Sequence, residues 1–250
     1  PYIFRAHNGV HVIYLTQTVD QLQAACNFLG NTIRGGGKIL FVGTKKQAQP
    51  IVRELAETHK QHFVTDRWLG GMLTNLKTVK QRLKRLKEIE AMEEDGSITG
   101  YVKQEQASIR REKQRLVKNL GGIRHMDSTP DAMFVVDIKR EHNAIAEARK
   151  LRIPIVALVD TNCDPELVDY PIAGNDDAIK AIQVIADAIG ETITEAKGVQ
   201  AAATDEQPAE AAPDAETAET ASAPETTPAS AEEAPAEPAA EEAAPAPAEA

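Results

Sequence analysis

The chain has few cysteines, few aromatic residues and no long apolar run. Its 250 residues include 2 Cys, 1 Trp and 4% aromatic residues. Cys26 and Cys163 lie far apart and have no paired spacing, which argues against a cysteine-based metal knuckle or redox couple. No apolar stretch approaches the roughly 18 residues that a membrane span needs, and no segment resembles a signal peptide. We therefore expect a cytoplasmic protein in a reducing compartment, with no membrane partner.

Sequence motifs for catalysis are also absent. The chain contains no Gly-x-Gly-x-x-Gly turn, no His-Glu-x-x-His unit and no Gly-x-Ser-x-Gly elbow. The run at 34–38, Arg-Gly-Gly-Gly-Lys, precedes its strand, and Ile39 replaces the Ser or Thr that a phosphate-binding loop requires. Because no nucleophile, base and orienting residue can be assembled, we expect no enzyme, no cofactor and no small-molecule substrate.

Two features leave chemical alternatives open. The turn at 43–46, Gly-Thr-Lys-Lys, follows an apolar strand and could hold one phosphate group, so the alternative function is a cytosolic α/β enzyme for a phosphorylated small molecule. Two solvated lysines on a glycine turn explain it equally well. Further along the chain, acidic and amide side chains could bind a hard cation. Helix and turn capping explain most of these more simply, so we expect no metal site. The acidic and amide side chains in question are Asp160, Asn162, Asp164, Asp176 and Asp177.

Charge is segregated along the chain. The net charge is −10, yet residues 1–125 carry 21 Lys and Arg against 11 Asp and Glu. Residues 126–198 carry 7 against 14, and residues 199–250 carry none against 13. Clustered positive charge in the first half suits a polyanion such as nucleic acid. The acidic residues of 126–198 suit a protein partner instead.

Apolar runs and intervening helical patterns predict a three-layer α/β sandwich with a mainly parallel sheet, of the Rossmann or flavodoxin-like type. Asp20 is expected to cap the first helix, and the glycines at 35–37 to end it. Asp176 is expected to cap the last helix. The five strand candidates are 10–15, 38–43, 61–65, 131–138 and 155–160.

The segment between the third strand candidate and Asp131 is too long for an ordinary crossover. Leu76, Val79, Leu83 and Leu86 recur at three-four spacing, which predicts an inserted, coiled-coil-like helical hairpin. The α/β core then comprises residues 1–74 and 121–198, and the hairpin residues 75–120. Residues 199–250 lack aromatic, Ile, Leu and basic residues and contain eight prolines. They predict a disordered acidic tail, for which composition alone suggests an adhesion or scaffold role.

The loop at 66–75, Asp-Arg-Trp-Leu-Gly-Gly-Met-Leu-Thr-Asn, lies between a strand candidate and the basic hairpin. Arg67 and Trp68 offer a phosphate fork and a stacking face, although Trp68 can equally be a buried anchor for the loop. We expect basic side chains of the loops and hairpin to neutralise RNA phosphates with little base discrimination. The predicted RNA contacts are Lys45, Lys46, Arg67, Trp68, Lys77, Lys80, Arg82, Lys84, Arg110, Arg111 and Arg115.

Long ordered runs of the chain resemble the bacterial small-subunit ribosomal protein S2 family. The matching runs are 1–4, 8–11, 39–48, 67–75, 120–123, 130–132, 160–165 and 170–178. The chain departs from the family pattern at Ala173, where proline is usual, and at Asp66 before Arg67-Trp68. It also lacks the family's Gly-Val-His-Phe-Gly-His segment, so we expect an N-terminal segment to be missing.

The resemblance implies a structural constituent of the small ribosomal subunit that catalyses no reaction. It implies binding to 16S ribosomal RNA, contact with neighbouring small-subunit proteins, and help in recruiting ribosomal protein S1 for translation.

Overall fold

The computed structural model describes residues 3–7 and 10–205, and the fold is built on a five-stranded parallel sheet. The sheet order is β4-β3-β5-β6-β7, and every neighbouring pair is parallel. The strands are β3 (Ile39–Val42), β4 (His62–Val64), β5 (Ala132–Val136), β6 (Ile155–Val159) and β7 (Tyr170–Ala173). Every residue of β3, β5 and β6 is buried, as the continuous apolar runs predict for strands covered on both faces.

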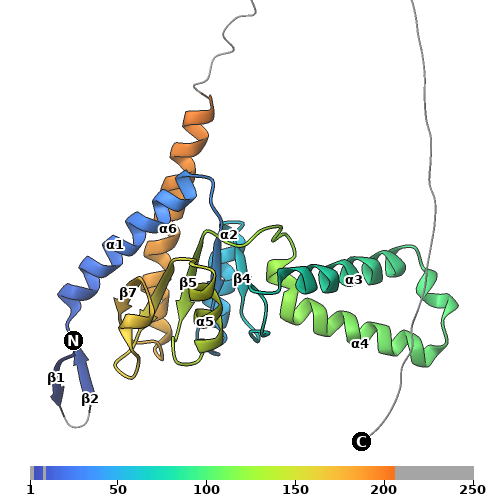
Figure 1. Ribbon diagram of the computed structural model, residues 1–250, viewed down its shortest axis with the longest axis horizontal. Helices are drawn as coiled ribbons and strands as arrows, with labels where there is room; N and C mark the ends of the chain where they lie inside the picture. Colours follow the sequence, from blue (N-terminus) through green and yellow to red (C-terminus); the bar gives the residue numbers. More distant parts are fainter. Residues whose placement is uncertain (1–2, 8–9, 206–250) are drawn as a thin grey trace, which may run out of the picture. The chain divides into compact units, whose positions relative to one another are not determined.

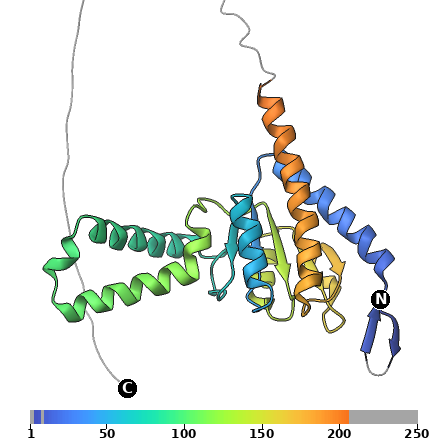
Figure 2. The same ribbon diagram turned by 180° about the vertical axis from the view of Figure 1, so that it is seen from behind.

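Helices cover both faces of the sheet and make the predicted three layers (Figures 1 and 2). On one face lie α1 (Leu15–Arg34), α2 (Gln49–Thr58) and α6 (Ile179–Asp205). They pack on Phe41, Phe134 and Leu158. The other face is covered by α5 (His142–Lys150) and by the base of a helical hairpin, which pack on Val42, Val135 and Ala157. Alternate side chains of each buried strand therefore feed two separate cores.

The helical hairpin consists of α3 (Leu76–Glu94) and α4 (Lys103–Leu120), and it extends from the β4 edge of the sheet (Figures 1 and 2). Asn75 caps α3 by accepting a hydrogen bond from the Thr78 amide. Gly96 takes a left-handed φ of 69° before the 3₁₀ turn η1 (Ser97–Gly100), as expected for the turn of the hairpin. Residues 1–208 form one compact unit. We propose that this unit consists of an α/β core and an inserted hairpin.

The hairpin returns to the sheet at Gly121 and Gly122, within the 3₁₀ turn η2 (Gly121–Ile123). A Cβ on Gly122 would lie 2.2 Å from the Phe63 carbonyl oxygen of β4. Only glycine allows the backbone to approach the edge strand this closely. The glycine pair thus sets the point where the hairpin joins the core.

The first strand candidate is wrong as a member of the main sheet. Residues 10–13 form β2 (Val10–Ile13), which pairs antiparallel with β1 (Ile3–His7) in a separate two-stranded sheet. The fifth strand of the main sheet is instead β7, which the sequence reading missed. It is a short edge strand and carries Pro171, and proline is tolerated in sheets mainly at edges.

Two helix starts also differ from the prediction. α1 begins at Leu15, so Asp20 is not its cap. The early turn is held by tertiary contacts, because Thr18 Oγ1 donates to the Ala173 carbonyl and Gln21 Oε1 accepts from the Ala173 amide. Before α6, Asn175 rather than Asp176 accepts from the Asp177 and Ala178 amides.

The other predicted helix features are confirmed. Gly35 follows the last residue of α1, and Asp164 accepts from the Glu166 amide at the 3₁₀ turn η3 (Pro165–Leu167). α6 continues to Asp205, into the range expected to be tail, and the rest of that range lies outside the described residues. Among the helices described, none has the length and apolar character required to cross a membrane.

Candidate nucleic-acid interface

The loop at 66–75 is organised by one carboxylate, that of Glu147 on α5. Its Oε1 accepts from the Trp68 indole Nε1 at 3.0 Å and from the Gly71 amide at 2.7 Å. Its Oε2 accepts from the Leu73 amide at 3.0 Å and from the Thr74 amide at 3.1 Å. Burial disfavours the charged carboxylate, but the Trp68 and backbone hydrogen bonds outweigh it and lower the pKa of Glu147. The loop is therefore a rigid turn wrapped around an anion.

Trp68 is an anchor of this loop and not an open stacking face. Its side chain packs in the core on the face of the sheet that α5 and the base of the hairpin cover, and the residue is only 9% exposed. Its N–H is committed to Glu147. We therefore withdraw Trp68 from the predicted RNA contacts, while Arg67 next to it is exposed and stays among them.

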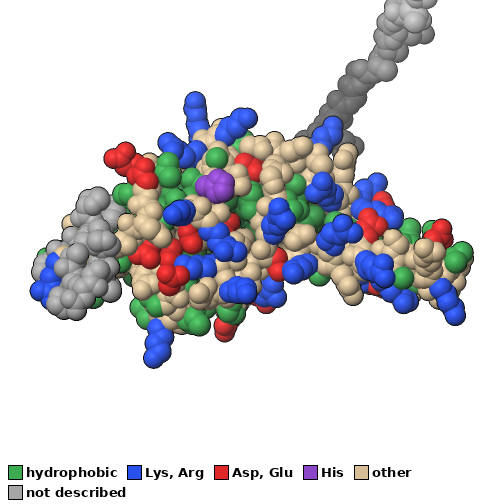
Figure 3. Space-filling view, turned by 90° about the horizontal axis from the view of Figure 1, so that it is seen from below, with side chains coloured by type: hydrophobic (Ala, Val, Ile, Leu, Met, Phe, Trp, Pro, Cys, Tyr) green, Lys and Arg blue, Asp and Glu red, His purple; other side chains and the backbone are tan. Residues whose placement is uncertain are grey.

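The hairpin displays basic side chains outside its apolar seam. Of the predicted seam residues, Val79, Leu83 and Leu86 are buried and Leu76 is partly buried; Ile89 of α3 is buried as well. Lys and Arg side chains are spread along the hairpin and over the adjoining body in the view from below (Figure 3). The predicted contacts on the hairpin are all exposed: Lys77, Lys80, Lys84 and Arg82 on α3, and Arg110, Arg111 and Arg115 on α4.

A groove of about 590 Å³ lies between the two helices of the hairpin. Arg82 from α3 and Arg115 from α4 both line it, so the fold brings together two predicted contacts that lie far apart in the sequence. Arg85 lines it as well, and its Nε lies 3.5 Å from Glu112 Oε1. Arg85 was missing from the predicted contacts, although its place three residues after Arg82 puts both on one helix face.

Lys80 and Lys84 follow Lys77 at helical spacing and form a second basic row on α3. Lys80 Nζ donates to the Asp127 carbonyl at 2.5 Å, which ties this row to the segment after the hairpin. The hairpin therefore offers cations on more than one side.

Three carboxylates surround the Lys45 ammonium group at the carboxyl ends of the strands. Its Nζ lies 2.7 Å from Asp176 Oδ1, 2.6 Å from Asp177 Oδ1 and 3.7 Å from Asp137 Oδ2. Burial lowers the pKa of Lys45, but these carboxylates outweigh burial and raise it. The side chain is 13% exposed. We therefore withdraw Lys45 from the predicted RNA contacts and keep its exposed neighbour Lys46.

The loop at 43–46 is poorly suited to a phosphate group. The Gly43 amide donates to the Val64 carbonyl, and the Thr44 amide donates to Glu141 Oε1. Thr44 Oγ1 also donates to Glu141 and accepts from Arg140 Nε. Because the Gly43 and Thr44 amides are occupied and three carboxylates surround Lys45, this loop offers an anion a poor binding site. These contacts argue against the alternative of an enzyme for a phosphorylated substrate.

The same strand ends hold three carboxylates that could bind a divalent cation. Oxygens of Asp160, Asp176 and Asp177 lie within 4.8 Å of one another. Burial raises the pKa of Asp176, Asp137 and Asp160 add to that effect, and Lys45 opposes it. Asp176 Oδ2 is buried without a hydrogen-bond partner among the residues that the structure describes. The fold thus brings Asp160 beside Asp176 and Asp177, which come later in the chain.

Comparison with known proteins adds an independent finding. The family model described as "Ribosomal protein S2" matches residues 1–196. A curated protein from Solidesulfovibrio magneticus, "Small ribosomal subunit protein uS2", is 51% identical over 215 residues. The aligned part covers 84% of this chain and 83% of that protein.

Proposed function

Since this chain belongs to the ribosomal protein S2 family, we propose that it binds 16S ribosomal RNA through basic side chains of its hairpin and loops. Membership of the family makes it a structural, non-enzymatic constituent of the small ribosomal subunit in the cytoplasm. It is thereby associated with ribosomal RNA and other ribosomal proteins. What we propose beyond this is that the RNA is 16S ribosomal RNA and that specific basic side chains contact it.

The observation that carries the proposal is the meeting of Arg82, Arg85 and Arg115 along one groove of the hairpin. Guanidinium groups present several N–H donors in a planar fork that matches phosphate oxygens. Glu112 and Glu88 balance part of this charge, at 3.5 Å and 3.6 Å from Arg85. Three guanidiniums along one groove suit the phosphates of a folded RNA.

The proposed interface retains the predicted residues that are exposed and adds Arg85. Binding through these groups releases counterions and positions the protein on the backbone with little reading of bases. Lys45 and Trp68 support the interface by fixing the loops that carry Lys46 and Arg67. The proposed contacts are Lys46, Arg67, Lys77, Lys80, Arg82, Lys84, Arg85, Arg110, Arg111 and Arg115.

We further propose that the protein helps recruit ribosomal protein S1 to the small subunit. Likeness to the family supports this partner. The acidic residues of 126–198 are the surface proposed for protein contact, because RNA phosphates would be repelled there. The amount of S1 that sediments with small subunits, compared with and without this chain, tests the assignment.

Incorporation into small subunits tests the proposed RNA interface. The triple variant Arg82→Glu, Arg85→Glu, Arg115→Glu should be lost from small-subunit fractions in gradient sedimentation. A matched control reverses Arg149, Lys150 and Lys180, which are exposed cations of the acidic half. The control should incorporate as the native chain does. Equal incorporation of both variants would contradict the proposal.

A further inference from the structure

A second groove, of about 600 Å³, runs between α2 and α6 on the opposite face of the sheet from α5 and the base of the hairpin. Its floor is apolar and includes Ile51, Leu55 and Ala186. Gly190 lets the helices approach, since a Cβ there would lie 3.0 Å from Leu55 Cδ1 and 3.1 Å from His59 Nε2. The groove is thus formed by helix packing of the core.

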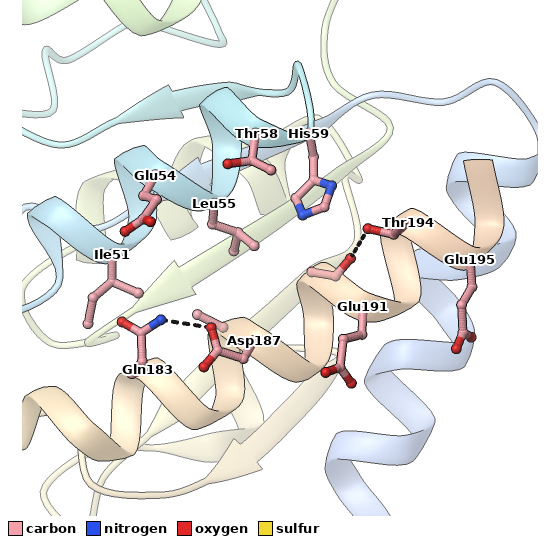
Figure 4. A pocket seen from close by; sticks show the side chains of 12 residues that line it. Ile51, Glu54, Leu55, Thr58, His59, Gln183, Asp187, Glu191, Thr194 and Glu195 are labelled. Carbon is pink, nitrogen blue, oxygen red and sulfur yellow. Dashed lines mark hydrogen bonds between the residues drawn. The ribbon is translucent and has the colours of Figure 1, made fainter. Parts of the chain in front are cut away.

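Carboxylates line the walls of this groove. Glu54 of α2 lies across from Asp187 of α6, and Glu191 and Glu195 follow along α6 (Figure 4). All four residues are exposed. Among the residues that the structure describes, none of the four forms an ion pair, whereas Glu90, Glu93 and Glu112 of the hairpin all do.

The cations near the groove leave these carboxylates unneutralised. Lys197 of α6 directs its Nζ to the His59 carbonyl oxygen instead of a carboxylate. Burial and the nearby Lys197 lower the pKa of His59, which disfavours a positive charge on the imidazole that lines the groove. Asp187 Oδ1 accepts a hydrogen bond from the neutral Gln183 side-chain amide at 2.7 Å.

Asp187, Glu191 and Glu195 are spaced by four residues and therefore lie on one face of α6. Like charges at this spacing repel one another and destabilise a helix. A row of cations laid against them would remove that repulsion. At about 1.5 Å of rise per residue, the part of α6 from Gln183 to Glu195 extends for roughly 18 Å, enough for about three turns of a partner helix.

We infer that the α2–α6 groove docks a lysine-rich polypeptide segment of another protein of the small subunit. Its apolar floor takes the aliphatic stems of the lysines, and the carboxylates of Glu54, Asp187, Glu191 and Glu195 take their ammonium groups. RNA is disfavoured in this groove by the same charges. The protein thus uses cations for RNA on its hairpin and carboxylates for a protein on its α2–α6 face.

Zero-length carbodiimide coupling in purified small subunits tests this inference, because it joins a carboxylate to an amine only when the two are in contact. Glu191 or Glu195 should couple to a lysine of another protein, and peptide mass spectrometry should identify the product. The Glu93–Lys113 ion pair within the hairpin provides an internal positive control. If that pair couples and the groove carboxylates give no intermolecular product, the inference is overturned.

A variant shows whether the contact contributes to binding. Asp187→Asn, Glu191→Gln, Glu195→Gln removes three exposed charges, and Glu94→Gln, Glu105→Gln, Glu166→Gln removes three exposed charges elsewhere. Both should fold and enter small subunits. We expect only the first to lose the partner identified by coupling, by tenfold or more in its retention at raised salt. Equal retention in both variants, or coverage of the groove by RNA, would overturn the inference.

Discussion

Glu147 accepts a hydrogen bond from the indole of Trp68, although 79 residues separate them in the chain. The same carboxylate accepts three backbone amides of the glycine loop. Replacing Glu147 with Ala should lower the free energy of unfolding by about 2–4 kcal/mol, because several donors lose a charged acceptor together. Urea denaturation measures the loss. Glu166→Ala, at an exposed position, is the control and should change stability by less than about 0.5 kcal/mol.

Acid should weaken the same loop. The folded pKa of Glu147 lies below its ordinary value of 4.5, so its stabilising effect is complete above that value. It is lost as the pH falls through the lower folded value. The difference in unfolding free energy between the native chain and Glu147→Gln should therefore shrink with acidification. Fluorescence of Trp68, the only tryptophan, reports the unfolding in both proteins. If this difference in unfolding free energy stays constant as the pH falls through the folded pKa of Glu147, the stabilising role of the Glu147 carboxylate is contradicted.

Lys45 should matter for stability more than for RNA binding. Lys45→Met leaves Asp176 and Asp177 without their cation, and breaking a buried pair in this way costs about 3–5 kcal/mol. The exposed side of this site reduces the expected loss to about 2–3 kcal/mol. Asp176→Asn in the same chain should restore part of it. Lys46→Met is the matched control, with weaker RNA binding and little change in thermal unfolding.

The junction between hairpin and core should tolerate no side chain. Gly122→Ala places a Cβ against the Phe63 carbonyl and should cost about 3 kcal/mol or more. Gly100→Ala is the matched control, because no atom lies within 4 Å of a Cβ built there. Thermal unfolding of the two variants should differ clearly. Similar midpoints would show that the junction can shift without cost.

The sequence predicted the parts of the fold that local pattern controls. The apolar runs of β3, β5 and β6 and the three-four spacing of Val79 and Leu83 leave few alternatives. β7 was missed because its burial depends on β6 beside it and on α1, whose Thr18 and Gln21 bond to Ala173. The helix cap predicted at Asp20 was wrong because α1 already begins at Leu15. The contacts of Thr18 and Gln21 with Ala173, which support this first turn, come from a distant part of the chain.

The candidate site was predictable in composition and less so in geometry. A basic hairpin follows from counting charges, and the exposure of Arg82 and Arg115 agrees with it. Local sequence does not distinguish Lys45 from Lys46, because the carboxylates that hold Lys45 come from residues 137, 176 and 177. In the same way, the role of Trp68 is set by Glu147 on a distant helix. Long-range partners decide which basic or aromatic residues remain available.

The salt dependence of 16S rRNA binding tests the central claim most directly. We expect the affinity of the native chain to fall linearly on a log–log plot against salt concentration. Replacing Arg82, Arg85 and Arg115 with Gln should weaken binding and reduce the magnitude of the slope by about 2–3, near one unit for each lost phosphate contact. Replacing Arg149, Lys150 and Lys180 with Gln should leave affinity and slope unchanged. An unchanged slope in the hairpin variant would contradict the account.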